Sequence, residues 1–439
     1  MMTRLPFVLA SLFAAACAAE DPAGHGHTPD VADLDGVLDP GTDPSPVDEE
    51  PRACVSVDSG LAQVGTHGVD ALRDVLVSAN GSILVAGSER GVAQGGTSPA
   101  LHTRGVVLEY AHDLRSFTRR AELATSGTDA IESLATDPDT GKLWFLGRTN
   151  DALAGTEARG DFDTIVGELP AEGGLRPRYR GFESTAEHAR RLAIGAGGHV
   201  AVAGHQIRND STDPLLAVFE IDGDVLAPQY THTRVAASDE RYDAVAVSAR
   251  GAVFGGTIAD SDEQGAFVGA RDLMARPLWR TQLSKDGRDR VTAVHVLPDG
   301  DVLWAGHAVS ALGETAHGGL DLVVGRLDGT TGTAKWTVQH GGETDETVAD
   351  LAVDANGRIF LTGHVTADGG DVDAYMLALD ADGNPLAQEV WGSSGNDRPA
   401  AITVDACGAI VIAGTTNGDL GGANHGDDDG FVIVTRLAH

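Results

Sequence analysis

The sequence lacks the short motifs by which most enzyme classes can be recognised. Its 439 residues contain no nucleophile elbow, helical zinc-binding histidine pair, phosphate-binding loop or Cys-x-x-Cys motif. Aromatic residues make up only 5% of the chain, and there are three cysteines. These absences predict that the protein has no catalytic residues and is not an enzyme.

Basic residues are also scarce. Lysine and arginine number 31 against 65 aspartates and glutamates, which gives a formal net charge of -34. A surface of that charge repels nucleic-acid phosphates and anionic lipid headgroups. We therefore expect no nucleic-acid partner, and contact with a membrane only through a lipid anchor. The charge also favours solubility.

The apolar run Leu5–Ala16 is too short to cross a bilayer and follows Arg4, so residues 1–16 are predicted to be a signal peptide. The run ends in Ala14-Ala15-Ala16-Cys17, which resembles the lipobox of bacterial lipoproteins. The resemblance implies lipidation of Cys17 and anchoring at the bacterial outer membrane or cell surface. Because Ala14 stands where the pattern prefers Leu, ordinary cleavage followed by secretion remains the alternative.

Residues 17–53 are predicted to form a disordered acidic tether. The segment is rich in Asp, Glu, Pro and Gly and has few large apolar residues. Such a composition cannot bury enough apolar surface to fold, and its like charges extend the chain. The folded domain is therefore expected to span residues 54–439.

This domain contains seven copies of one repeat. Val353–Gly363 and Val404–Gly414 follow the same pattern, which also occurs at Val77–Gly87. Each copy has a short apolar strand, a glycine turn, a nearly all-apolar strand, and two further strands, the last of which usually carries an aromatic residue. In the sixth copy the first three strands are expected at 349–353, 359–362 and 374–379. The turn glycines are Gly81, Gly141, Gly198, Gly251, Gly300, Gly357 and Gly408.

Four antiparallel strands per copy predict the blade of a β-propeller, since radial stacking buries both apolar faces of each sheet. The last copy ends after its third strand, 431–437, and Cys54–Asp58 aligns with the missing fourth strand. We therefore predict an all-β, seven-bladed β-propeller of four-stranded antiparallel blades, closed by an N-terminal strand that completes the last blade.

Closure of this kind is expected to bring two cysteines to one face of the last blade. Cys54 begins the closing strand, and Cys407 lies in the turn between the first two strands of the seventh copy. In an oxidising compartment the pair is predicted to form a disulfide, which on the chain-entropy model contributes roughly 4–5 kcal/mol. Two unpaired thiols are the alternative.

The repeat resembles that of the seven-bladed β-propellers of exported bacterial proteins. Its pattern is Asp-x-Ala-x-x-(Ile/Leu)-x-Val-Asp-x-x-Gly-x-(Ile/Val)-x-(Val/Leu)-x-Gly, and a later element of the family is present as Asp373-Ala374-Tyr375-Met376. The resemblance covers residues 54–439. Members are mostly uncharacterised surface or secreted proteins, so the resemblance implies a fold and export rather than an activity.

Acidic residues recur at two positions of the repeat. The first precedes each turn glycine by eleven or twelve residues: Asp70, Asp129, Glu187, Glu240, Asp289, Glu346 and Asp397. These carboxylates either form a ring that attracts a cation or accept backbone N–H bonds where one blade joins the next. Their presence in all seven copies favours the structural role.

The second position, at the start of the third strand, holds Asp163, Asp213, Asp321, Asp373 and Asp429. With the neighbouring loop acids, Asp371, Asp373, Asp427, Asp428 and Asp429 are candidate ligands for calcium, the one cofactor considered, although their spacing matches no EF-hand or nonapeptide repeat. Capping of the strand is the favoured interpretation. His205, His307 and His364 fall on separate blades, so no metal site is predicted from them.

These features predict a non-catalytic cell-surface or secreted module. It is expected to be a monomer that binds or scaffolds an extracellular protein or a cell-envelope component, through variable loops on one face of the ring. The alternative is a propeller lyase, hydrolase or quinone-dependent dehydrogenase with its site in the central channel. That alternative requires asymmetric polar residues that converge at the axis.

Overall fold

A computed structural model describes residues 59–437, except 67–69, 93–100, 112, 152, 154–161, 182–185, 209–210, 224, 234–238, 260–263, 314 and 368. The chain divides into two compact units, Met1–Arg52 and Ala53–His439. All the described residues belong to the second unit, so the predicted signal peptide and tether lie outside them. In this part of the chain every regular element is a strand, and no helix could cross a membrane.

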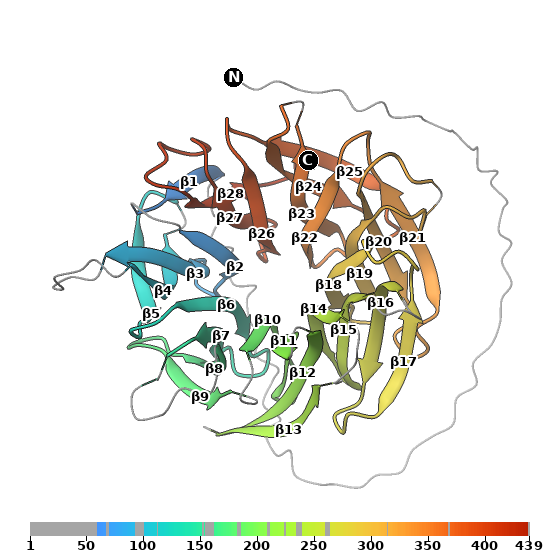
Figure 1. Ribbon diagram of the computed structural model, residues 1–439, viewed down its shortest axis with the longest axis horizontal. Helices are drawn as coiled ribbons and strands as arrows, with labels where there is room; N and C mark the ends of the chain where they lie inside the picture. The colour runs from blue at the N-terminus through green and yellow to red at the C-terminus, as the bar shows by residue number, and fades with distance from the viewer. Residues whose placement is uncertain are drawn as a thin grey trace, which may run out of the picture. The chain divides into compact units, whose positions relative to one another are not determined.

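The 28 strands of the described residues form seven antiparallel sheets of four strands each, arranged as blades around a common axis (Figure 1). Blades one and two are β2 (Ala71–Val77), β3 (Ile83–Val92), β4 (Leu101–Tyr110) and β5 (Phe117–Leu123), then β6 (Asp129–Thr136), β7 (Leu143–Thr149), β8 (Asp163–Leu169) and β9 (Arg176–Arg180). Blades three and four are β10 (Ala186–Gly195), β11 (His199–Arg208), β12 (Ser211–Asp222) and β13 (Val225–Thr233), then β14 (Asp239–Ser248), β15 (Gly251–Ala259), β16 (Gln264–Arg271) and β17 (Pro277–Gln282).

Blades five and six are β18 (Arg290–Val296), β19 (Val302–Ala308), β20 (Asp321–Leu327) and β21 (Ala334–His340), then β22 (Glu346–Val353), β23 (Ile359–Thr366), β24 (Val372–Leu379) and β25 (Pro385–Trp391). Blade seven combines β26 (Asp397–Val404), β27 (Ile410–Thr416) and β28 (Asp429–Thr435) with β1 (Gly60–Val64). In each blade the first strand lies nearest the axis and the fourth lies outermost (Figure 1). The predicted fold, a seven-bladed propeller of four-stranded antiparallel blades, is confirmed.

The ring is closed by an N-terminal strand, as predicted. β1 pairs antiparallel with β28, with Gly60 opposite Val434 and Val64 opposite Gly430. The closing strand is Gly60–Val64, which corrects the predicted assignment to Cys54–Asp58, a segment that lies outside the described residues. The length of the crossover explains the shift: β1 ends six residues before Asp70, just as β25 ends six residues before Asp397.

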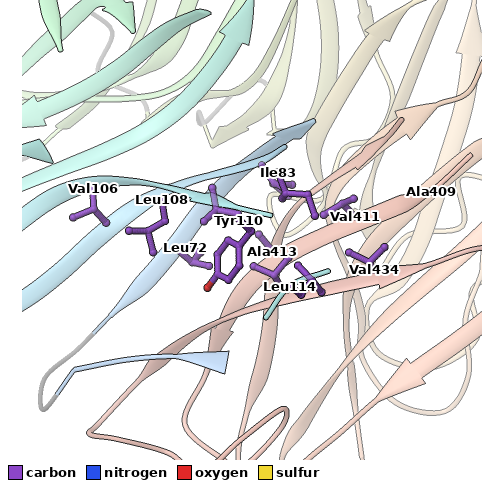
Figure 2. Close-up of a cluster of buried hydrophobic side chains, with 14 residues drawn as sticks. Leu72, Ile83, Val106, Leu108, Tyr110, Leu114, Ala409, Val411, Ala413 and Val434 are labelled. Atoms are coloured by element: carbon purple, nitrogen blue, oxygen red, sulfur yellow. The ribbon is translucent and has the colours of Figure 1, made fainter. Parts of the chain in front are cut away.

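Each interface between neighbouring blades is filled by one cluster of apolar side chains. Seven such clusters occur in the described residues, and each draws its members from two consecutive blades. The cluster at the closure joins Leu72, Ile83 and Leu108 of blade one to Val411 and Val434 of blade seven (Figure 2). The closing interface is therefore packed as the other six are.

Glycine is required at two places in the repeat. The seven predicted turn glycines all adopt positive φ, from 70° at Gly141 to 137° at Gly251, which side chains rarely tolerate. A second glycine recurs near the end of each second strand. At this position the constraint is the close approach of a neighbouring backbone, which leaves no room for a side chain. A Cβ atom at Gly363 would overlap the carbonyl oxygen of Thr347 on the adjacent inner strand.

Replacing this second glycine should destabilise the blade. We expect Gly363→Ala to lower the free energy of unfolding by roughly 2–3 kcal/mol, because the backbone must move to admit the methyl group. The matched control is Gly174→Ala, where nothing lies within 4 Å of the added Cβ, and it should change stability by less than about 0.5 kcal/mol. Urea denaturation followed by tryptophan fluorescence measures both, and equal midpoints for the two variants would contradict the packing argument.

Candidate functional site

The first recurring acid holds the crossover between blades. The Asp129 carboxylate accepts from the backbone N–H of Thr125 at 2.6 Å, and Asp397 accepts in the same way from Ser393 at 2.7 Å. Glu346 accepts from Gly342 at 3.0 Å, so in each case the donor lies four residues earlier. All seven acids of this set are buried. These contacts support the structural role that their repetition favoured.

The second recurring acid is also engaged by its own blade. Asp163 pairs with Arg180 at 2.6 Å, Asp321 accepts from Gln339 Nε2 at 2.7 Å, and Asp429 accepts from Gln63 Nε2 at 2.9 Å. The last bond joins β28 to the closing strand β1. Strand capping, the favoured interpretation, therefore accounts for these side chains.

The candidate calcium ligands do not form a cluster. Asp429 is fully buried, whereas Asp371 and Asp427 are exposed. Nowhere among the described residues do three or more His, Cys, Asp or Glu side chains come close enough together to hold a metal ion. Calcium binding by Asp371, Asp373, Asp427, Asp428 and Asp429 stays a prediction.

Cys407 lies in the turn between β26 and β27, as expected. Its backbone N–H donates to Asp405 Oδ1 at 2.8 Å, and its carbonyl accepts from Arg436 at 2.8 Å. β1 begins at the same end of blade seven as this turn, since Gly60 pairs with Val434 and Thr435 pairs with Ile410. Cys54 lies outside the described residues, so the disulfide stays a prediction.

A β-bulge occurs at the same point in every inner strand. Each pairing of a first strand with its second strand shifts register three residues after the recurring acid. A bulge leaves one residue unpaired and turns its side chain away from the regular pleat. The bulged residues are, in blade order, Arg73, Glu132, Arg190, Asp243, Thr292, Ala349 and Ala400.

These seven residues line a cavity of about 500 Å³ on the ring axis, to which every inner strand contributes. Its charged lining consists of six arginines and two carboxylates: Arg73, Arg148, Arg190, Arg191, Arg290 and Arg398, with Glu132 and Asp243. The wall is asymmetric, because blades one to four carry charged bulge residues and blades five to seven carry Thr292, Ala349 and Ala400. In this lining the sevenfold pattern gives way to a concentration of positive charge.

Both carboxylates of the cavity are already paired. Glu132 contacts two arginines, with Arg73 Nε at 3.3 Å and Arg148 Nε at 2.8 Å. Asp243 accepts two hydrogen bonds from Arg290, at 2.8 and 2.6 Å. Such forked contacts are strong and directional.

Arg191 crosses the axis. Its guanidinium extends from blade three to the carbonyl oxygens of Ala349 in blade six and Ala400 in blade seven, both at 3.3 Å. It lies 3.9 Å from the Asp350 carboxylate. Burial raises the pKa of Asp350 to about 6, against the opposing effect of Arg191, and burial also raises the pKa of Asp74, which Arg191 again opposes. Arg191 therefore compensates two desolvated carboxylates.

Arg190 and Arg398 differ from the other cavity arginines. Within the described part of the chain, neither side chain has a hydrogen bond or an ion pair. Both residues are exposed, although they line the cavity. These two arginines are therefore the groups of the cavity that are available to a ligand.

The three histidines considered in the sequence lie beside this cavity, on second strands. In the register between first and second strands, His205 lies opposite His188, His307 lies opposite Arg290, and His364 lies opposite Thr347. The rings of His188 and His205 are stacked with 5.1 Å between centroids. Burial, followed by the nearby Arg190, lowers the pKa of His205 to about 3. The histidines are therefore neutral neighbours of the arginines at physiological pH.

The arginine cavity was missed by sequence reasoning, which looked for residues that recur. Counting three residues on from each recurring acid gives Arg, Glu, Arg, Asp, Thr, Ala and Ala, which is a position where the repeat is not conserved between copies. That departure from the repeat is the signal that could have located the site.

Comparison with known proteins supports the architecture alone. No family model and no curated protein sequence matches the chain. Among solved structures 383 chains resemble it. One is Sqt1 from Chaetomium thermophilum, which is 14% identical, covers 86% of this chain and 100% of its own, and superposes with a TM-score of 0.50. At this identity the likeness shows a shared propeller fold and no more.

Two adjacent arginines should differ sharply in their effect on stability. We expect Arg191→Ala to cost roughly 3–5 kcal/mol of unfolding free energy, because it leaves Asp74 and Asp350 buried without their compensating cation. Arg190→Ala removes a side chain of the same type that has no partner, and should change stability by less than about 0.5 kcal/mol or increase it. Urea titration of both variants is the test, and equal losses would contradict the described contacts.

The stability of the wild type relative to Asp350→Asn should depend on pH. The Asp350 pKa rises on folding from 3.8 to about 6, so the stabilisation from the protonated carboxyl is complete below about pH 4 and is lost as the pH rises through 6. Asn imitates the protonated form at every pH. The wild type should therefore lose up to ~3 kcal/mol relative to the variant between pH 4 and 7. Paired urea titrations across this range measure the difference, and a constant difference would show that Asp350 does not titrate there.

Proposed function

We propose that this protein is a non-catalytic binding or scaffold module of the bacterial cell exterior. The fold supports a binding role in general, because a rigid ring that carries variable loops is a common recognition scaffold. In this proposal the partner is an extracellular protein or a cell-envelope component, and the protein acts as a monomer. Export by the signal peptide and anchoring through a lipid on Cys17 belong to the same proposal, with secretion as the alternative. A Cys54–Cys407 disulfide would then lock the closed ring.

The observation that carries the proposal is the difference between the two faces of the ring. On one face, the connections between second and third strands range from two residues between β11 and β12 to thirteen between β7 and β8. On the opposite face the connections are all short, at two to six residues. We call the first face the loop face. The buried acids described above fix the crossovers between blades on this face. The loops between second and third strands therefore vary in length while the crossovers beside them keep one geometry.

The chemistry of the axial cavity supports binding over catalysis. The cavity is polar and asymmetric, which is what the enzyme alternative requires. However, no described Ser, Cys, Lys or Tyr lines it. Both of its carboxylates are paired with arginine, and burial lowers the pKa of His188, the one imidazole in the lining. The cationic groups of the lining are therefore arginines, which suit the cavity to binding an anion.

Charge reversal on the loop face tests this proposal. The exposed Asp371 and Asp427 are both changed to Lys in the full-length chain, and the control carries Asp222→Lys and Asp382→Lys, which change the charge equally on the opposite face. Wild-type protein is used to capture partners from an envelope extract, and the affinity of the identified partner is then measured by surface plasmon resonance. We expect the loop-face variant to bind at least about tenfold more weakly, and the control to bind as the wild type does.

Equal affinity of the two double variants would place recognition elsewhere. Failure of the wild type to retain any partner, together with turnover of a substrate by the purified protein, would favour the enzyme alternative instead.

A further inference from the structure

We propose that the axial cavity is a binding site for a small oxyanion that carries two or more carboxylate or phosphate groups. This site lies on the ring axis, near the loop-face ends of the inner strands, and it does not depend on the partner proposed for the loops. Arg190 and Arg398 would hold the ligand, and the remaining arginines would supply the surrounding positive field.

The first argument is the balance of charge. The chain as a whole carries a net charge of -34, yet the cavity gathers six arginines against two carboxylates. Those two carboxylates form ion pairs with Arg73, Arg148 and Arg290, while the charge of Arg191 is compensated by Asp74 and Asp350. The ion pairs therefore account for four of the arginines and leave two.

The second argument is the accessibility of the unpaired pair. Arg190 and Arg398 are both exposed, although they line the cavity. An exposed guanidinium without an ion pair can bind an oxyanion without first breaking a contact within the protein. The two acids near Arg190, Glu132 and Asp243, are already paired with other arginines.

The third argument is the placement of the two arginines. Arg190 belongs to blade three and Arg398 to blade seven, so blades one and two separate them on one side and blades four to six on the other (Figure 1). A ligand that contacts both must reach across the axis and needs an anionic group near each end. Arginine forks match the two oxygens of a carboxylate or phosphate.

The shape of the cavity limits the size of the ligand. The small side chains of Thr292, Ala349 and Ala400 leave space opposite the charged wall, and Arg191 crosses the axis one residue further along β10 than Arg190. The volume of about 500 Å³ lies in the range of small-molecule sites. A long polyanion such as nucleic acid would have to approach through the negative field of the whole protein.

Isothermal titration of the full-length protein with citrate and with pyrophosphate tests the proposal, and the two probes separate carboxylate from phosphate recognition. Acetate serves as the monovalent comparison. We expect at least one polyvalent probe to bind with a Kd below about 1 mM and acetate to bind at least about tenfold more weakly. Raising the salt concentration should weaken binding.

Variants identify the residues that bind. Arg190→Gln combined with Arg398→Gln should weaken binding by at least about tenfold, and should keep the fold because neither side chain has a partner within the described residues. The control combines Arg276→Gln and Arg288→Gln, two arginines with side chains 74% and 70% exposed, and should bind as the wild type does. Circular dichroism and urea midpoints establish that each variant is folded.

Two results would overturn the proposal: no saturation by either polyvalent probe up to about 10 mM, or equal affinity of folded wild type and the Arg190/Arg398 variant. The loop-face variant Asp371→Lys with Asp427→Lys should bind the probe as the wild type does. Loss of binding in that variant alone would mean that the anion is held on the loop face, so the two proposals can fail independently.

Discussion

The architecture depends on one constraint, which is that each four-stranded sheet is apolar on both faces. Such a sheet cannot be stable alone, because one face or the other would contact water. Arrangement in a ring gives every face a partner, and the seven clusters of buried side chains lie where the faces meet. The same constraint explains β1, since without it β28 would present an unpaired edge.

Closing the ring creates an axis where seven strands converge and little apolar surface remains to be buried. Polar side chains therefore carry the contacts there. Asp74 in blade one accepts from the backbone N–H of Leu134 in blade two at 2.7 Å, and Ser133 contacts Leu192 of blade three in the equivalent way. Arg191 completes this network by reaching across to blades six and seven. The centre of the ring is thus held by hydrogen bonds and charges, while the periphery is held by apolar packing.

The parts of the structure that the sequence predicted are those that repeat. The turn glycines and the four-stranded blade could be predicted because the same pattern of turns and apolar strands recurs in seven copies. The closing strand was placed at residues 54–58 instead of 60–64 because one short apolar segment looks much like another when it is aligned alone. The fixed spacing from the fourth strand to the recurring acid, visible at Val64 and Asp70, would have corrected it.

The axial cavity could not be found by the same reasoning. A bulge in an inner strand is not evident from a single sequence, and the ion pairs of Glu132 join residues from different blades. Arg190 and Arg191 are neighbours in the sequence, yet one is compensated across the axis and the other has no partner. Only the positions at which the copies differ carry this information, and their meaning depends on knowing that all seven meet at one point.

A crystal structure of the protein grown with citrate would test this account most directly. The account predicts a closed seven-bladed ring with β1 in blade seven, Arg191 across the axis, and citrate density in contact with Arg190 and Arg398. It would be contradicted by a cavity that holds no citrate and in which acidic side chains of the protein itself pair with those two arginines.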